Sequence, residues 1–256
     1  MKTKKSSIKF YAVVALLLSF ASTTQANNVN ITGTSVSGSN ITFNISWDNS
    51  WNANVAPNNW DAVWVFVKYQ DCATRLWTHA SLSTIGGDHT AASPLQVDPV
   101  SDGKGVFLRR SALGGGNVGS TSITLKMTIP AGTYNYKVYG VEMVNVPQGN
   151  FEIGDGVSAS TYNSYTVTAA SQSGGLSSAI LGGASVAVPS TFPMGYNSFY
   201  CMKYEITQEQ YVEFLNSLTY TQQAARVTSD PISAAGTYAF ANANRNGIRI
   251  SVPGSN

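Results

Sequence analysis

The chain is 256 residues long, with 43% hydrophobic residues and only 11% charged residues. This apolar content can supply a packed core, so a disordered protein is not expected. The formal charge is +2, but the first 26 residues hold four lysines and no acidic residue, which leaves the remainder at −2. The charge therefore does not indicate a protein that binds nucleic acid or anionic membranes.

The first 26 residues predict a signal peptide that is removed during export. Its apolar core, residues 10–21, is too short to span a bilayer comfortably, and Thr24 and Ala26 are the small residues that a signal peptidase requires. An uncleaved membrane anchor is the alternative. The residue directly after Ala26 is not a cysteine, so lipid attachment at the new N-terminus is not expected. We expect a mature protein that begins near Asn27 and is secreted, periplasmic or at the cell surface. The basic residues before the apolar core are Lys2, Lys4, Lys5 and Lys9.

Residues 27–140 have the pattern of a series of strands. In "NITFNISWD" (40–48), apolar residues alternate with polar ones, which is typical of a half-buried strand. The run "DAVWVFVKYQ" (61–70) is more continuously apolar, as expected of a central strand covered on both faces. Gly, Asn, Asp and Pro residues separate the later runs "TRLWTHASL", "GKGVFLRRSA", "TSITLKMTI" and "TYNYKVYGVEMV".

No helical periodicity interrupts these runs, which predicts a mainly β fold. The expected architecture for residues 27–140 is an antiparallel β-sandwich of the immunoglobulin type. A single closed barrel is the alternative. The Cys…Trp…Cys spacing of antibody domains is missing, so the prediction concerns the architecture and not membership of the antibody family.

The chain has only two cysteines, Cys72 and Cys201. This number excludes a disulfide-rich scaffold, even for an exported protein. Three interpretations of the two thiols remain open. They pair with each other, each is a buried apolar thiol, or Cys201 has a partner beyond the end of this chain.

Residues 141–256 differ in composition and predict a second domain. "VEMVNVPQGNFEIGDG" (141–156) has the pattern of a strand, a turn, a short strand and a tight loop. Residues 157–190 are rich in Ser, Ala, Gly and Thr, which predicts a flexible connection that holds one strand, "YTVTA". The apolar run "FYCMKYEI" (199–206) is predicted to be a strand that leads into the most strongly specified helix.

That helix has clear local signals. Thr207 is a favourable N-cap, and Gln210 three residues later completes a capping box. Four apolar residues then recur at helical spacing and should share one face of an amphipathic helix docked on a sheet. A shorter helix is expected around Gln222–Arg226. The apolar face consists of Tyr211, Phe214, Leu215 and Leu218.

Residue patterns that could carry chemistry are few. His79 and His89 are too few ligands for a metal site and are expected to be solvated. Asp98 and Asp102 lack the remaining ligands of a calcium loop, and Asp102-Gly103 predicts a turn. The glycine-rich run 113–117 precedes no helix, so it does not predict a phosphate-binding loop.

Aromatic residues are the remaining candidates for a binding site. Trp51 and Trp60 lie in expected loops and could stack on sugars, although core packing accounts for most tryptophans. Basic residues do not interleave with the aromatic ones, so a nucleic-acid partner is not expected. No residue is assigned to a catalytic, cofactor-binding or metal site.

Two blocks of residues 141–256 resemble the opening of the formylglycine-generating enzyme family, also called sulfatase-modifying factors. The first block consists of Met143, Val144, Pro147, Gly149, Phe151 and Gly154. The second consists of Phe199, Glu205, Ile206, Thr207, Tyr211, Phe214 and Asn216. The resemblance implies an irregular α+β domain related to C-type lectins, of which this chain holds only the first part.

The resemblance carries no active-site residue onto this chain. The family's paired cysteines, which bind copper, belong to a later part of the domain, and Cys201 does not match either of them. Copper or calcium is therefore expected only in a full-length relative. Two functions are implied. The full-length parent is a formylglycine-generating oxidase, or the protein is a non-catalytic secreted or surface protein for binding or adhesion, with a protein or glycan as its partner.

Overall fold

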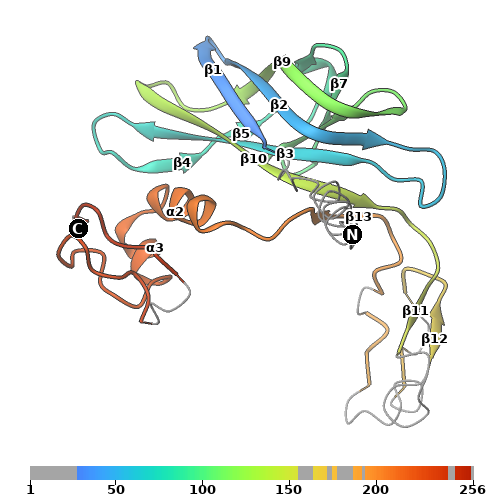
Figure 1. Ribbon diagram of the computed structural model, residues 1–256. Helices are drawn as coiled ribbons and strands as arrows, with labels where there is room; N and C mark the ends of the chain where they lie inside the picture. The colour runs from blue at the N-terminus through green and yellow to red at the C-terminus, as the bar shows by residue number, and fades with distance from the viewer. Residues whose placement is uncertain are drawn as a thin grey trace, which may run out of the picture.

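The computed structural model describes most of the chain after the predicted signal peptide, which itself lies outside the described residues. The fold is mainly β and its sheets are antiparallel, as predicted. Two large sheets pack face to face, and a two-stranded arm and two short helices follow them (Figure 1). The described residues are 28–154, 164–171, 175–177, 187–191, 194–241 and 246–254.

The first sheet has the strand order β1-β2-β9-β5, with β6 also paired to β9. The second has the order β13-β10-β3-β8-β7, with β4 also paired to β3. The strands of the first sheet are β1 (Asn30–Ser37), β2 (Asn40–Asn52), β5 (Ser81–Leu82), β6 (Thr90–Ala91) and β9 (Gly114–Thr128). Those of the second are β3 (Asp61–Asp71), β4 (Trp77–His79), β7 (Leu95–Pro99), β8 (Val106–Arg110), β10 (Tyr134–Val146) and β13 (Phe199–Met202).

The core lies between the two sheets and follows from the alternation of side chains along the strands. Phe43, Ile45 and Trp47 of β2 are buried against Val63 and Val65 of β3. Alternate side chains of a strand point to opposite faces, so the polar residues between them point away from the core. The alternation predicted for residues 40–48 is confirmed, and the strand extends to residue 52.

Strand β3 is central, as predicted, but only one of its faces lies in this core. Its outward side chains Trp64, Phe66 and Lys68 are half-buried. They are covered from outside by a segment that follows much later in the chain, and not by a third layer of sheet. The continuous apolar run therefore reflects two different environments on the two faces of one strand.

The second sheet includes residues from both sides of the predicted domain boundary at residue 140. Strand β10 pairs with β3 without interruption from Tyr134 to Val144. Its last residues, Met143–Val146, pair with β13, which thereby becomes the edge strand of the same sheet. The predicted boundary falls within β10, because strand pairing continues until the turn that contains Pro147.

Several short strands carry no strong sequence signal. Strands β1, β6 and β7 were not expected, and the glycine-rich run after Leu113 begins β9 instead of forming a loop. These segments are held by cross-strand hydrogen bonds, which depend little on their own side chains. The turn predicted at Asp102-Gly103 is confirmed, and Gly103 has a φ of +66°, a conformation that glycine adopts readily.

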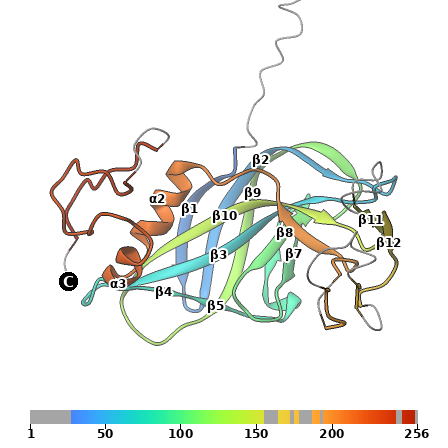
Figure 2. The same cartoon turned by 90° about the horizontal axis from the view of Figure 1, so that it is seen from below.

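Beyond the sandwich lie a small arm and two helices. The arm pairs β11 (Phe151–Ile153) with β12 (Tyr165–Val167). Helix α2 (Gln208–Asn216) lies below the second sheet, at the opposite end from the arm (Figures 1 and 2). None of the helices in the described ranges is long and apolar enough to span a membrane.

Both helices begin with a capping box. In α2 the predicted bonds are present, since the Thr207 hydroxyl accepts from the Gln210 N–H and the Gln210 side chain accepts from the Thr207 N–H. Helix α3 (Tyr220–Ala224) begins two residues before the predicted start. A second box, formed by Thr219 and Gln222, fixes that start.

Candidate functional site

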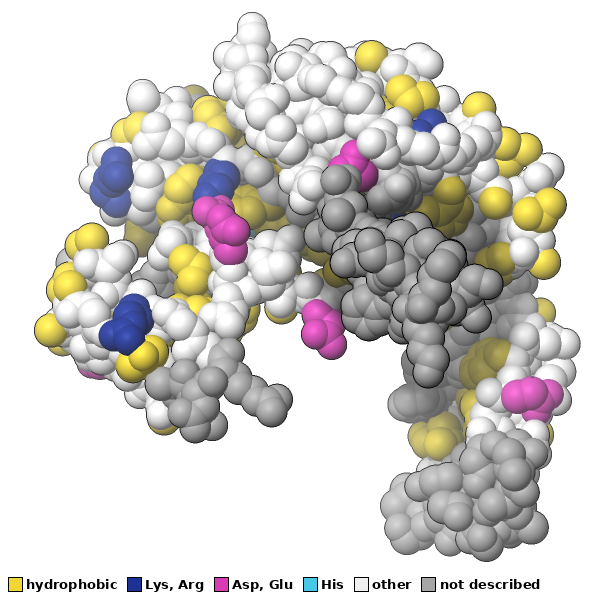
Figure 3. All heavy atoms as spheres, viewed as in Figure 1, with side chains coloured by type: hydrophobic (Ala, Val, Ile, Leu, Met, Phe, Trp, Pro, Cys, Tyr) yellow, Lys and Arg dark blue, Asp and Glu magenta, His cyan; other side chains and the backbone are white. Residues whose placement is uncertain are grey.

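A large cavity lies between helix α2 and the outer face of the second sheet, and we call it the α2 groove. Its volume is about 860 Å³. Its floor consists of outward side chains of β3, β4 and β10, and α2 supplies the opposite wall. The space-filling view shows hydrophobic side chains where the α2 segment meets the sandwich (Figure 3).

The floor of the groove is a row of stacked rings on three neighbouring strands. The rings of Tyr139 and Phe66 are 5.0 Å apart and inclined by 6°. Phe66 and His79 continue the stack at 5.6 Å and 11°. Trp64 packs at the side of Phe66, at 4.8 Å. Each stack joins outward positions of adjacent strands, which pairing brings close together, and the result is an extended aromatic surface.

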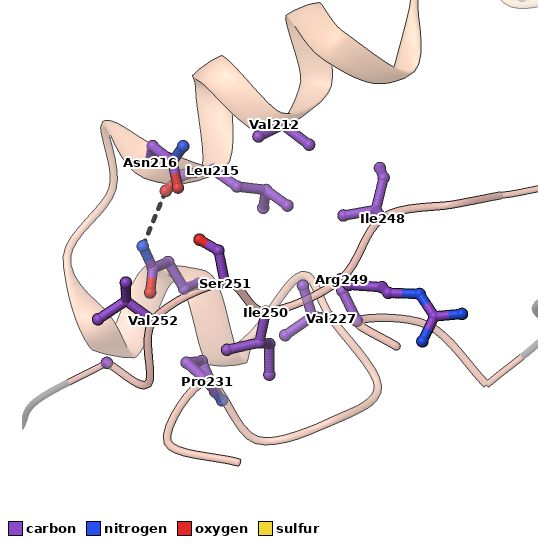
Figure 4. A pocket seen from close by; sticks show the side chains of 13 residues that line it. Val212, Leu215, Asn216, Val227, Pro231, Ile248, Arg249, Ile250, Ser251 and Val252 are labelled. Carbon is purple, nitrogen blue, oxygen red and sulfur yellow. Dashed lines mark hydrogen bonds between the residues drawn. The ribbon is translucent and has the colours of Figure 1, made fainter. Parts of the chain in front are cut away.

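Helix α2 supplies Tyr211, Phe214 and the following Leu218 to the groove. Leu215 instead points into a second, smaller cavity of about 170 Å³ on the far side of the helix, together with Val212 (Figure 4). The four residues predicted to form one apolar face are therefore divided between two cavities. The reason is that the chain after α3 packs against the helix from the side opposite the sandwich.

The C-terminal end of α2 is attached to the sheet by Lys68. The Lys68 Nζ donates to the carbonyl oxygen of Ser217 at 2.6 Å and to its hydroxyl at 3.2 Å. Ser217 is the C-cap of α2, so the ammonium satisfies a helix-end carbonyl and interacts favourably with the helix dipole. Burial in the groove lowers the pKa of Lys68 below its usual value.

A second polar contact holds the middle of the helix. The Lys137 Nζ of β10 forms an ion pair with the Glu213 carboxylate of α2. The side chains of both residues are about two-fifths exposed, so this pair contributes at most about 1 kcal/mol to stability. Its main effect is to hold α2 at a fixed distance from the aromatic row on the sheet.

His79 ends the aromatic row and should titrate at an unusually low pH. Its Nε2–H donates to the Lys104 carbonyl at 2.6 Å, and burial disfavours the charged ring and lowers its pKa. The unfolded chain therefore takes up the proton first as the pH falls below about 6.5, and His79 then reduces the stability of the fold. Above that pH the contribution vanishes.

An NMR titration of the histidine ring protons measures this directly. We expect a midpoint for His79 below about 6.5. In His79→Phe, the fall of the melting temperature with decreasing pH should become shallower between about pH 6.5 and 5. A midpoint at or above the ordinary histidine value would contradict the effect of burial.

A buried charge cluster attaches the segment before α2 to the sandwich. The Lys203 Nζ lies 3.4 Å from Asp61 Oδ2 and 3.8 Å from Glu142 Oε2, with side-chain exposures of 10%, 1% and 12%. The ammonium also lies 4.5 Å from the centre of the Trp51 ring. Because Lys203 directly follows β13, the cluster determines where the chain leaves the sheet toward α2.

The tryptophans predicted as sugar-stacking candidates are used within this attachment. Trp51 Nε1–H donates to Asn59 Oδ1 at 3.0 Å, and its ring faces Lys203. Trp60 Nε1–H donates to the Tyr200 hydroxyl of β13 at 2.9 Å, and Arg109 lies over its ring. Both rings are half-buried, and neither lines the α2 groove.

The histidine and cysteine predictions are corrected in part. His89 is buried rather than solvated, and its two ring nitrogens bond the Ser83 carbonyl and the Lys126 N–H. Cys72 and Cys201 are both exposed and do not form a disulfide. The interpretations of a buried apolar thiol and of a disulfide between the two cysteines are therefore wrong. Within the described parts of the chain, no group of three or more His, Cys, Asp or Glu side chains is placed to hold a metal ion.

The sequence patterns did not predict the α2 groove. Its signal is present in "VWVFVKY" and "YKVYG", where aromatic and lysine residues occupy the alternate positions that face away from the core. Such positions on an exposed sheet face normally carry small polar residues. A comparison with family models, curated proteins and solved structures finds no match for this chain. The resemblance to the formylglycine-generating enzyme family stays a prediction.

Proposed function

We propose that this protein is an exported, non-catalytic binding protein that holds a small apolar ligand in the α2 groove. The observation that carries the proposal is the combination of a cavity of about 860 Å³ with a continuous aromatic floor. Small-molecule sites are typically cavities of about 300–1,000 Å³ with a mostly apolar lining and a few polar groups. The predicted signal peptide supports export.

An apolar ligand fits this lining better than a glycan. Recognition of a sugar requires several hydrogen-bonding groups that are directed at its hydroxyls, in addition to a stacking ring. In the α2 groove, the polar groups of Ser217 and Glu213 already bond lysines of the second sheet. Aromatic and aliphatic side chains form most of the remaining surface.

We further propose that the sandwich is of the immunoglobulin type. In that fold the strand order is A-B-E-D in one sheet and G-F-C in the other. The order β1-β2-β9-β5 corresponds to the first, and β13-β10-β3 corresponds to the second. Strands β8 and β7 extend the second sheet beside β3, but they follow β5 along the chain, so they do not correspond to the strands C′ and C″ that precede strand D in variable domains. On this assignment β13 is strand G, and the arm that carries β11 and β12 is an insertion between strands F and G.

This assignment also bears on the two functions implied by the family resemblance. The residues of the second block lie in strand G and in the segment that continues into α2. They therefore belong to the edge strand of the second sheet and to one wall of the groove. No reactive group is required of them in this role. Of the two implied functions, the non-catalytic binding protein is the one that the groove supports.

The test is calorimetric titration of the mature chain with octanol, an apolar ligand that is small enough for the groove. We expect saturable binding that weakens about tenfold in Phe66→Ala, a loss of about 1.4 kcal/mol, because the ring lies at the centre of the aromatic row. Phe151→Ala is the matched control, since Phe151 is 37% exposed on the arm and outside the groove.

Circular dichroism should confirm that both variants are folded, and Tyr139→Ala provides a second change in the same row. Absence of octanol binding to the wild-type chain would refute the proposal. Equal loss of affinity in Phe66→Ala and Phe151→Ala would also refute it. Cellotriose serves as the glycan probe, and binding of this sugar without octanol binding would replace the apolar ligand with a glycan.

A further inference from the structure

The charges around the α2 groove are unequal. Lys137 is paired with Glu213, and the buried Lys203 is paired with Asp61 and Glu142. Lys68 differs from both, because no carboxylate among the described residues lies within ion-pair distance of its Nζ. Its two acceptors, the carbonyl and hydroxyl oxygens of Ser217, are neutral.

An ammonium without a counter-ion is costly in such surroundings. Lys68 extends from β3 between the aromatic row and the end of α2, where Trp77 and Leu218 also line the groove. A charge that has lost part of its hydration is stabilised most effectively by an opposite charge at short range. The two neutral oxygens and the negative end of the α2 dipole stabilise the ammonium in part, but neither supplies a full opposite charge.

We propose that the ligand of the α2 groove is a small amphiphilic carboxylate, whose apolar body lies on the aromatic row and whose carboxylate pairs with Lys68. The inference rests on the proposed function and specifies the chemical class of its ligand. Two features of the groove meet in this class. The aromatic floor favours an apolar body. Lys68, which has no ion-pair partner among the described residues, favours one negative charge next to that body.

The neighbouring groups are compatible with an anion at this position. His79 faces the same space, and burial lowers its pKa and favours the neutral ring, so Lys68 and not His79 supplies the positive charge for the ligand. The Glu213 carboxylate, the one acidic group in the described lining, is already held by Lys137. A carboxylate at Lys68 therefore meets one cation and no unpaired acidic side chain.

The experiment compares octanoate with octanol, which share a chain length and differ in charge. Calorimetric titration of the mature protein at pH 7 should give an affinity for octanoate about tenfold higher than for octanol, equivalent to about 1.4 kcal/mol. In Lys68→Met, which keeps the length of the side chain, the affinities for octanoate and octanol should become equal, so that the preference for octanoate disappears even if the loss of the bond to Ser217 weakens binding of both compounds. Lys126→Met, which removes a lysine on the other sheet, should retain the preference.

The outcomes separate this inference from the proposed function. If octanol binds in the groove but octanoate binds no more tightly, the inference is overturned and the proposed function stands. If neither compound binds, the proposed function is refuted, together with the inference that rests on it. A preference for octanoate that survives in Lys68→Met also overturns the inference. Lys68→Arg keeps the charge and should keep the preference, which guards against a variant that has merely lost its fold.

Discussion

A chain consisting of residues 27–140 will fail to fold, whereas residues 27–206 will form a cooperative domain. The shorter chain loses the end of β10, including the residues that pair with Trp64, Val63 and Ala62 of the central strand. It also loses β13 and the charge cluster that follows it. Strand pairing continues past the predicted boundary at residue 140, so we expect the folding unit to include strand β13.

The energetic reason lies mainly in Asp61. Its carboxylate is 1% exposed, so removal of Lys203 leaves a buried charge without its cationic partner, at a cost of about 3–5 kcal/mol. A domain of this size has a total stability of only about 5–15 kcal/mol, and the lost strand pairing adds to the deficit. The shorter chain should therefore lie close to or beyond the limit of stability.

Circular dichroism melts and amide NMR spectra of the two chains provide the measurement. We expect a sharp melt and dispersed amide signals only for residues 27–206. A version of the longer chain with Lys203→Met separates the charge cluster from strand pairing, and it should melt cooperatively but at a lower temperature than the unsubstituted longer chain. Comparable cooperative melts for residues 27–140 and 27–206 would show that β13 is not an integral strand.

Asp61→Ala is the point substitution with the largest expected effect on stability, a loss of about 3–5 kcal/mol. The carboxylate accepts from Trp47 Nε1–H at 3.0 Å, from the Ser50 hydroxyl at 2.8 Å and from the Trp51 N–H at 2.9 Å. All three donors lose their acceptor in the variant. The Lys203 ammonium loses its closest counter-ion and keeps only Glu142 at 3.8 Å.

Urea denaturation measures the effect as a lower midpoint with an unchanged slope. Asp98→Ala is the matched control, because the Asp98 side chain is 36% exposed and pairs with Arg109 at the surface. Its loss should be about 1 kcal/mol or less. Asp61→Asn keeps an acceptor but removes the charge, so it should fall between the two. A loss in Asp61→Ala no larger than in Asp98→Ala would mean that the cluster does not hold the sandwich together.

The sequence by itself determined the features that depend on neighbouring residues. The alternation of residues 40–48 predicted β2 and its buried face, because successive side chains of a strand point to opposite sides. The start of α2 followed from Thr207 and Gln210, which bond each other's backbone within one turn. The mainly β class followed from the sum of such local patterns.

Only the tertiary structure decided the features that join distant parts of the chain. The run at residues 199–202 has the pattern of a strand, but its partner, the end of β10, is fixed by pairing across a long insertion. Nothing in the sequence around Lys203 indicates that its side chain will be buried next to Asp61. The groove forms only where β3, β4, β10 and α2 come together, and strand register and the burial of apolar side chains determine that arrangement. Both depend on contacts between distant residues, which form only when the chain folds. The binding site could therefore not be found from local patterns.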